Sequence, residues 1–280
     1  MWIEAEITDM NDSVVHLRTH YYQQFDADPA LDVPAEGFGG WKTADLPLDL
    51  KRTALVVMHA WDYGSAEAFP GWRRVVEYIP RAEHICKTVF PQLLQAVRAS
   101  PMPVFHVVSE GDYFRHCPGY QRARNLTAES SLESVAIKGG DTHRRLKAFR
   151  SESVYVGRHN QMDVDRGFAQ MDFAQAAKPV GDEAIAENSA QLLALCQEAS
   201  VDHLIYVGFA INWCLLLSPG GMADMRRHGL LCSTIAEAVT AVENKDSARD
   251  EREKASALWR VALEFGFVYH LDDFISALRC

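Results

Sequence analysis

The sequence predicts an α/β fold with a doubly wound, mostly parallel sheet. Short, continuous apolar runs at 53–60 and 203–210 are typical of strands that are covered on both faces. Segments with helical spacing, such as the amphipathic stretch 182–199, lie between such runs. Alternation of this kind from Thr53 onward indicates a six-stranded sheet with helices on both faces.

Each expected element follows from a local pattern. Strands are expected at 53–60, 102–110, 153–159, 203–210, 230–239 and 267–271. Helices are expected at 79–99, 182–199, 222–229, 246–266 and 272–280. Pro91 interrupts the first of these helices, and the polar stretch 111–152 contains one expected helix near 141–150. The first and fourth strands are predicted to be neighbours in the sheet.

The chain divides into an N-terminal extension, residues 1–50, and a domain at 51–280. Residues 2–10 and 13–25 are expected to pair as a hairpin around Asn11-Asp12, followed by a loop rich in Pro, Gly and acids. The extension has aromatic residues but too little apolar mass for its own core. We therefore expect it to pack on the domain or on a neighbouring subunit, in a homo-oligomer that is a dimer or larger.

Composition excludes several classes of protein. A net charge of -10 argues against nucleic acid as a partner. No apolar run approaches the ~20 residues needed to span a bilayer. The six cysteines are scattered without a C-x-x-C pair, which is typical of reduced thiols and predicts a cytoplasmic protein.

Three residues at predicted strand ends form the candidate site. Cys214 follows the fourth strand at a strand-to-helix turn, where backbone amides and the helix dipole lower a thiol pKa and favour a nucleophile. The alternative is a buried structural thiol. His59, after the first strand, is either the base for Cys214 or is satisfied by a backbone carbonyl. Arg158, at the end of 153–159, either holds the thiolate or pairs with a nearby acid.

The segments RTALVVMHAWD, VYVGRHN, GFAINWC and ALEFGFVYHLDDFISAL resemble the isochorismatase-like cysteine hydrolases, relatives of nicotinamidases and N-carbamoylsarcosine amidases. The resemblance covers about residues 53–279. It implies a thioester formed on Cys214 and a cis peptide bond between Phe209 and Ala210. It also implies an oxyanion hole made by the backbone amides of Ala210 and Cys214.

The sequence departs from the family pattern around the cysteine. The resemblance places His59 where the family has Asp, Arg158 where it has Lys, and Ile211 where it has Thr. Arginine keeps a positive charge but cannot donate a proton under normal conditions. In addition, residues 218–221 (SPGG) interrupt what is an unbroken helix in the family.

Two functions from different classes remain open. The first is a cysteine-dependent hydrolase of a small amide or related carbonyl compound, with Trp61 and Trp213 lining its pocket. The second is a non-catalytic protein of the same fold that binds a small molecule or serves as an assembly subunit. An isochorismate-cleaving enzyme without a thioester is a weaker third reading, because the cysteine is present. No cofactor or metal is expected: 63–77 has no histidine, and Asp112 and His116 lack the spacing of nicotinamidase ligands.

Overall fold

The computed structural model describes residues 13–127 and 139–279 and contains one eight-stranded sheet. The six strands from β8 to β5 run parallel, and β1 and β2 add an antiparallel pair at one edge. In spatial order the strands are β2 (Gly40–Asp49), β1 (Val14–Gln23), β8 (Val268–Tyr269), β7 (Leu231–Val239), β6 (His203–Gly208), β3 (Thr53–Met58), β4 (Val104–Val107) and β5 (Ala184–Ala186). The predicted α/β class with six parallel strands is confirmed, and the extension raises the total to eight.

The central strands β3 and β6 are buried along their whole length, as their continuous apolar sequences predict. They are neighbours, in register from Thr53 opposite His203 to Met58 opposite Gly208. The predicted adjacency of the first and fourth strands is therefore confirmed. Because both strands end at the same level, the residues that follow them meet at the carboxyl edge of the sheet.

Helices cover both faces of the sheet and divide the core into two layers. Successive side chains of β3 point alternately into the two layers. Leu55 and Val57 pack in the first layer, and Ala54, Val56 and Met58 pack in the second. The first layer includes residues of α1 (Pro70–Val75), α2 (Ile79–Thr88), α3 (Phe90–Arg98), α6 (Gln161–Ala169) and α10 (Leu271–Ala277). The second includes residues of α4 (Pro118–Leu126), α7 (Ser189–Glu198), α8 (Met222–Arg227) and α9 (Arg252–Glu264).

Two expected elements differ from the structure in a simple way. The helical pattern at 79–99 is two helices, α2 and α3, and Pro91 lies in the first turn of the second, where its missing amide hydrogen costs no helical bond. The polar stretch 111–152 contains α4 in addition to the expected helix, which is α5 (Asp141–Ser153).

The strand expected at 153–159 is absent from the structure. This segment follows α5 as irregular chain in which Val154 and Tyr155 are 59% and 46% exposed. The strand that pairs with β4 is instead β5, a three-residue Ala-Ile-Ala segment that lies inside the predicted helix 182–199. That helix begins only at Ser189, where the side chain of Asn188 caps it by accepting a hydrogen bond from Gln191 N at 3.0 Å.

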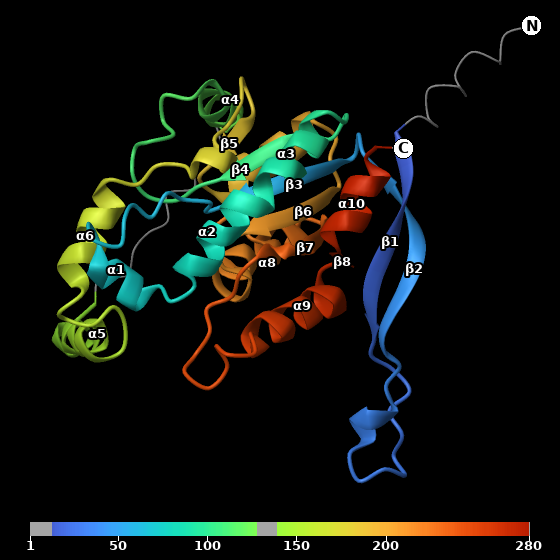
Figure 1. Ribbon diagram of the computed structural model, residues 1–280, viewed down its shortest axis with the longest axis horizontal. Helices are drawn as coiled ribbons and strands as arrows, with labels where there is room; N and C mark the ends of the chain where they lie inside the picture. The colour runs from blue at the N-terminus through green and yellow to red at the C-terminus, as the bar shows by residue number, and fades with distance from the viewer. Residues whose placement is uncertain (1–12, 128–138, 280) are drawn as a thin grey trace, which may run out of the picture.

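The N-terminal hairpin differs from the expected one. Residues 2–10 lie outside the described residues, and β1 pairs with β2 along ten residues across the loop 24–39. Near its loop end, β1 joins the main sheet through His20 opposite Val268. Figure 1 shows the hairpin as an arm that projects well beyond the body of the domain. The extension is thus continuous with the domain's sheet.

None of the helices in residues 13–127 and 139–279 combines the length and apolar character needed to cross a bilayer.

Candidate active site

The candidate site forms where β3 and β6 end. His59 follows β3, while the peptide bond between Phe209 and Ala210, directly after β6, is cis as the resemblance implied. The chain then forms a wide π-helical turn, Ile211–Leu215, that carries Cys214. Gly208 is required here, because its φ is +123° and a Cβ atom would lie 1.9 Å from the carbonyl oxygen of Met58.

His59 and Cys214 line the same cavity, which has a volume of about 230 Å³. Trp61 and Trp213 also line it, from the ends of the same two strands. Its other aromatic lining residues are Tyr63, Trp72, Tyr78, Tyr155 and Phe168, and its remaining polar ones are Glu77, Ser109, Glu110 and Ser218. The cavity is therefore walled by flat apolar surfaces with a few polar groups, as is typical of small-molecule sites.

The surroundings of Cys214 have opposing effects on the pKa of its thiol. Burial raises its pKa, and the charge of Glu110 adds to this effect. Hydrogen bonds from the Ser218 hydroxyl and from the Ala210 backbone amide act in the opposite direction. Because burial is the largest influence, the pKa lies above its usual value, and the sequence-based expectation of a lowered thiol pKa was wrong.

The imidazole of His59 is buried, and neither of its ring nitrogens has a hydrogen-bond partner among the described residues. Its ring stacks on Trp61 with centroids 4.7 Å apart, and burial lowers its pKa to about 4. The backbone of His59 has φ of +53°, which is rare for a residue with a side chain. Buried polar atoms without partners are uncommon, so a neutral imidazole at a cavity wall is available to a bound ligand.

Glu110 is a site residue that the sequence did not single out. It lies three residues after β4, with φ of +59°, and lines the cavity. Its charge reaches the Cys214 thiol, as the raised pKa shows. The sequence feature that could have identified Glu110 is its position at the end of the predicted strand 102–110, next to the strand that carries His59.

Arg158 lies apart from this group. It is exposed, it does not line the cavity, and it follows no strand. The residue that directly follows β5 is Glu187, which accepts a hydrogen bond of 2.6 Å from the Tyr120 hydroxyl. No lysine or arginine among the described residues lines the cavity, so the cationic position that the resemblance implied is not filled there.

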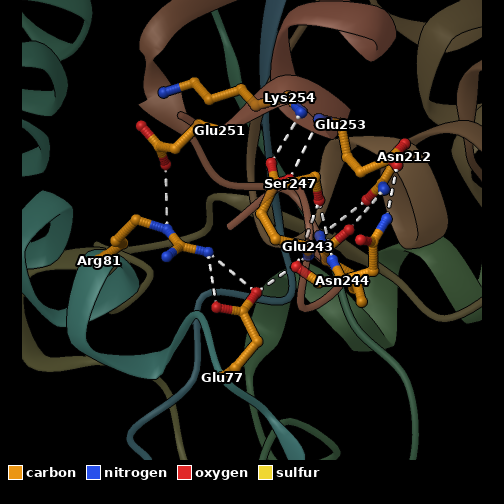
Figure 2. A network of polar contacts seen from close by, with 10 residues as sticks. Glu77, Arg81, Asn212, Glu243, Asn244, Ser247, Glu251, Glu253 and Lys254 are labelled. Atoms are coloured by element: carbon orange, nitrogen blue, oxygen red, sulfur yellow. Dashed lines mark hydrogen bonds and ion pairs between the residues drawn. The ribbon is translucent and has the colours of Figure 1, made fainter. Parts of the chain in front are cut away.

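A polar network supports the wall of the cavity (Figure 2). Glu77 lines the cavity and accepts two hydrogen bonds of 2.9 Å from Arg81 and one of 2.9 Å from the backbone amide of Glu243. Asn212, two residues before Cys214, exchanges two hydrogen bonds of 2.9 Å with the backbone of Val242. The π-helical turn is thereby tied to the loop that follows β7, which restricts the position of the cysteine.

The described residues contain no group of three or more His, Cys, Asp or Glu side chains that could hold a metal ion.

Comparison with known proteins gives a likeness of structure. No protein-family model and no curated protein matches the sequence. A cysteine hydrolase from Pseudomonas syringae pv. phaseolicola 1448A is 17% identical with a TM-score of 0.48, over 84% of this chain and 95% of that one. An isochorismatase family protein from Burkholderia thailandensis is 14% identical with a TM-score of 0.46, over 82% and 97%. N-carbamoylsarcosine amidase from Thermoplasma acidophilum is 16% identical with a TM-score of 0.43, over 79% and 97%. These are likenesses of structure at low identity and TM-scores below 0.5, and no property of those proteins is carried over to this chain.

Proposed function

We propose that this protein is a cysteine-dependent hydrolase of a small amide or a related carbonyl compound, acting through a thioester on Cys214. The observation that carries the proposal is the composition of one small cavity. The sulfur of Cys214 accepts a hydrogen bond from the Ala210 amide there, and the His59 imidazole lines the same cavity with both nitrogens unpartnered. A nucleophile with an amide donor at its sulfur and a candidate base thus line one cavity, without a hydrogen bond between them.

In the proposed reaction the Cys214 sulfur attacks the carbonyl carbon of the substrate while neutral His59 takes the thiol proton. Backbone amides of Ala210 and Cys214 stabilise the negative charge that develops on the carbonyl oxygen. Collapse breaks the carbon–nitrogen bond, and the amine leaves with the proton from His59. Water, deprotonated by His59, then attacks the thioester and releases the carboxylic acid, which restores the thiol.

The walls of the cavity favour an uncharged, flat substrate. Trp61 and Trp213 provide large apolar surfaces, whereas Glu110 supplies negative charge with no lysine or arginine among the described lining residues; Glu77 is paired with Arg81. An anionic substrate would meet this charge in a partly buried site, which costs free energy. We therefore propose a small aromatic or apolar carboxamide as the substrate class.

A non-catalytic binding protein remains the second candidate, because of the state of the thiol. Burial raises the pKa of Cys214, so the protein without ligand contains little of the nucleophilic thiolate. The same cavity and the same aromatic walls could then bind a small molecule without transforming it.

Mass spectrometry of the intact protein separates the two functions. The protein is incubated with a panel of small aromatic amides, the reaction is quenched in acid, and the mass of the intact protein is measured. A hydrolase gives an added acyl mass that hydroxylamine removes, and Cys214→Ser gives no hydroxylamine-labile adduct. His59→Gln should lower the rate of adduct formation. Ligand-induced stabilisation against heat, with neither adduct nor released acid for any bound amide, would instead identify a binding protein.

A further inference from the structure

The helix α5 buries none of its side chains among the described residues, although Ser151 at its end donates a hydrogen bond of 3.3 Å to the side chain of Gln161 in α6. None of its thirteen residues is buried, and Leu146 and Phe149, one turn apart, are 60% and 64% exposed. Most helices bury an apolar stripe against a core. Its sequence has four basic and two acidic residues, so it is positive on a chain whose net charge is -10. Arg145 and Arg150 flank the two apolar side chains at i,i+4 spacing and form no ion pair among the described residues.

The end of the N-terminal arm has the complementary properties. We call residues 25–36 the tip; all twelve are exposed, and they include four acids and no base. Phe25 and Val33 are 55% and 53% exposed. The tip is also internally ordered, because Asp28 N donates to Pro34 O at 2.9 Å and the Asp28 side chain accepts from Ala30 N at 2.9 Å. A preformed acidic loop with exposed apolar side chains loses little entropy on binding.

The arm is held in its direction by the domain. Trp259 of α9 donates a hydrogen bond to the Gln24 side chain at 3.1 Å, and its ring packs edge-on against Tyr22. The tip begins directly after this anchor. Figure 1 places α5 at the lower left of the molecule and the tip at the lower right, with α9 and the loop before it between them. Within one chain the tip therefore cannot reach α5.

We propose that the tip of one chain docks on α5 of a second copy of this protein, with tip acids against the basic residues of α5 and Phe25 and Val33 against Leu146 and Phe149. Opposite charges and exposed apolar groups on the two surfaces supply the complementarity. Pairing of two arms through the free edge of β2 is disfavoured, because that edge strand carries Pro47 and the charged residues Lys42 and Asp45.

The docked helix lies next to the candidate active site. Tyr155 follows α5 by two residues, lines the cavity and makes an edge contact with Trp213, at 5.7 Å between ring centroids. A partner's tip on α5 would therefore bind the helix that leads directly into the segment at one side of the cavity. The interface and the cavity are thus joined by a short piece of chain.

Sedimentation velocity of the full chain tests the proposal with two charge-reversed proteins. One carries Asp32→Lys and Glu36→Lys in the tip, and the other carries Arg145→Glu and Arg150→Glu on α5. Each alone should self-associate at least about tenfold more weakly than the wild type, because like charges meet. An equimolar mixture of the two should regain association, since each reversed surface then faces its opposite. Arg249→Glu, at an exposed position elsewhere, is the control that should leave association unchanged.

Zero-length carbodiimide cross-linking of the wild type gives a second measurement that needs no variant. Peptides joining Lys147 to acids of the tip should occur in the cross-linked dimer and be lost in high salt. A wild type that sediments as a monomer throughout the micromolar range would overturn the proposal. So would association that survives both reversals, or a mixture that fails to regain it while both proteins keep the wild-type circular dichroism spectrum.

Discussion

The substitution His59→Gln should make the stability of the protein less sensitive to acid. Burial lowers the pKa of His59 to about 4, whereas an unfolded histidine titrates near 6.5. Between these two values the unfolded state binds the proton and the folded state does not. The free energy of unfolding therefore falls as the pH falls through this window, and the loss is complete below the folded pKa.

The size of the effect follows from the two pKa values. For a single site, the shift from 6.5 to about 4 removes about 2 kcal/mol of unfolding free energy between pH 7 and pH 5, and about 3 kcal/mol by pH 4. Glutamine has no proton to gain, so the variant should lack this loss. His203, whose pKa burial also lowers to about 4, contributes equally to both proteins and cancels in the difference.

The assay is urea denaturation of the wild type and His59→Gln at pH 7, 6 and 5, followed by tryptophan fluorescence. The difference in unfolding free energy between the two proteins should change by about 2 kcal/mol in favour of the variant across this range. His228→Gln, an exposed position, controls for removal of an imidazole as such. If the difference in unfolding free energy between the two proteins stays constant with pH, His59 is not a buried, neutral imidazole. The proposal that it acts as the base would then be refuted as well.

Three further outcomes follow from the same structure. Alkylation of Cys214 by iodoacetamide at pH 7 should be slower than that of free cysteine, because burial raises the pKa of the thiol. Ser218→Ala should slow the alkylation further, and equal rates in the wild type and this variant would contradict the hydrogen bond from Ser218 to the thiol. Arg158→Ala, at an exposed position away from the cavity, should leave the alkylation profile against pH unchanged; a shift in that profile would show that the arginine acts on the thiol. Gly208→Ala should lower the free energy of unfolding by at least about 2 kcal/mol, because the new Cβ atom would overlap the Met58 carbonyl oxygen. A urea denaturation curve like that of the wild type would contradict the close approach of Gly208 to that oxygen.

The central part of the fold could be predicted because its strands have a strong local pattern. The runs 53–58 and 203–208 are mostly apolar and short, and that combination is typical of strands covered on both faces. Strand β5 could not be found in this way. Its Ala-Ile-Ala sequence is short and runs directly into a helix, so it extends the helical pattern and takes its strand conformation from pairing with β4.

The candidate site was predictable where it depends on those two strands and not elsewhere. His59 and Cys214 follow β3 and β6 and share a cavity, but Arg158 was assigned from Val-Tyr-Val, a strand-like sequence in exposed chain. Tertiary pairing, which the sequence does not reveal, decides which short apolar run joins the sheet. The direction of the Cys214 pKa shift was missed for a related reason: the turn predicts favourable amides, whereas burial depends on aromatic residues brought from distant segments.

The position of β8 in the sheet has a consequence for folding. This two-residue strand lies between β1 and β7, and the anchor beside it joins Trp259 to Gln24 across 235 positions of the sequence. The β1–β2 hairpin is local and can close early, but it has no place to dock until the last strand is available. During synthesis, β1 and β2 therefore leave the ribosome long before β8, the strand on which they dock. Such long-range closure slows folding and leaves the hairpin and the β7 edge open to wrong partners in the meantime.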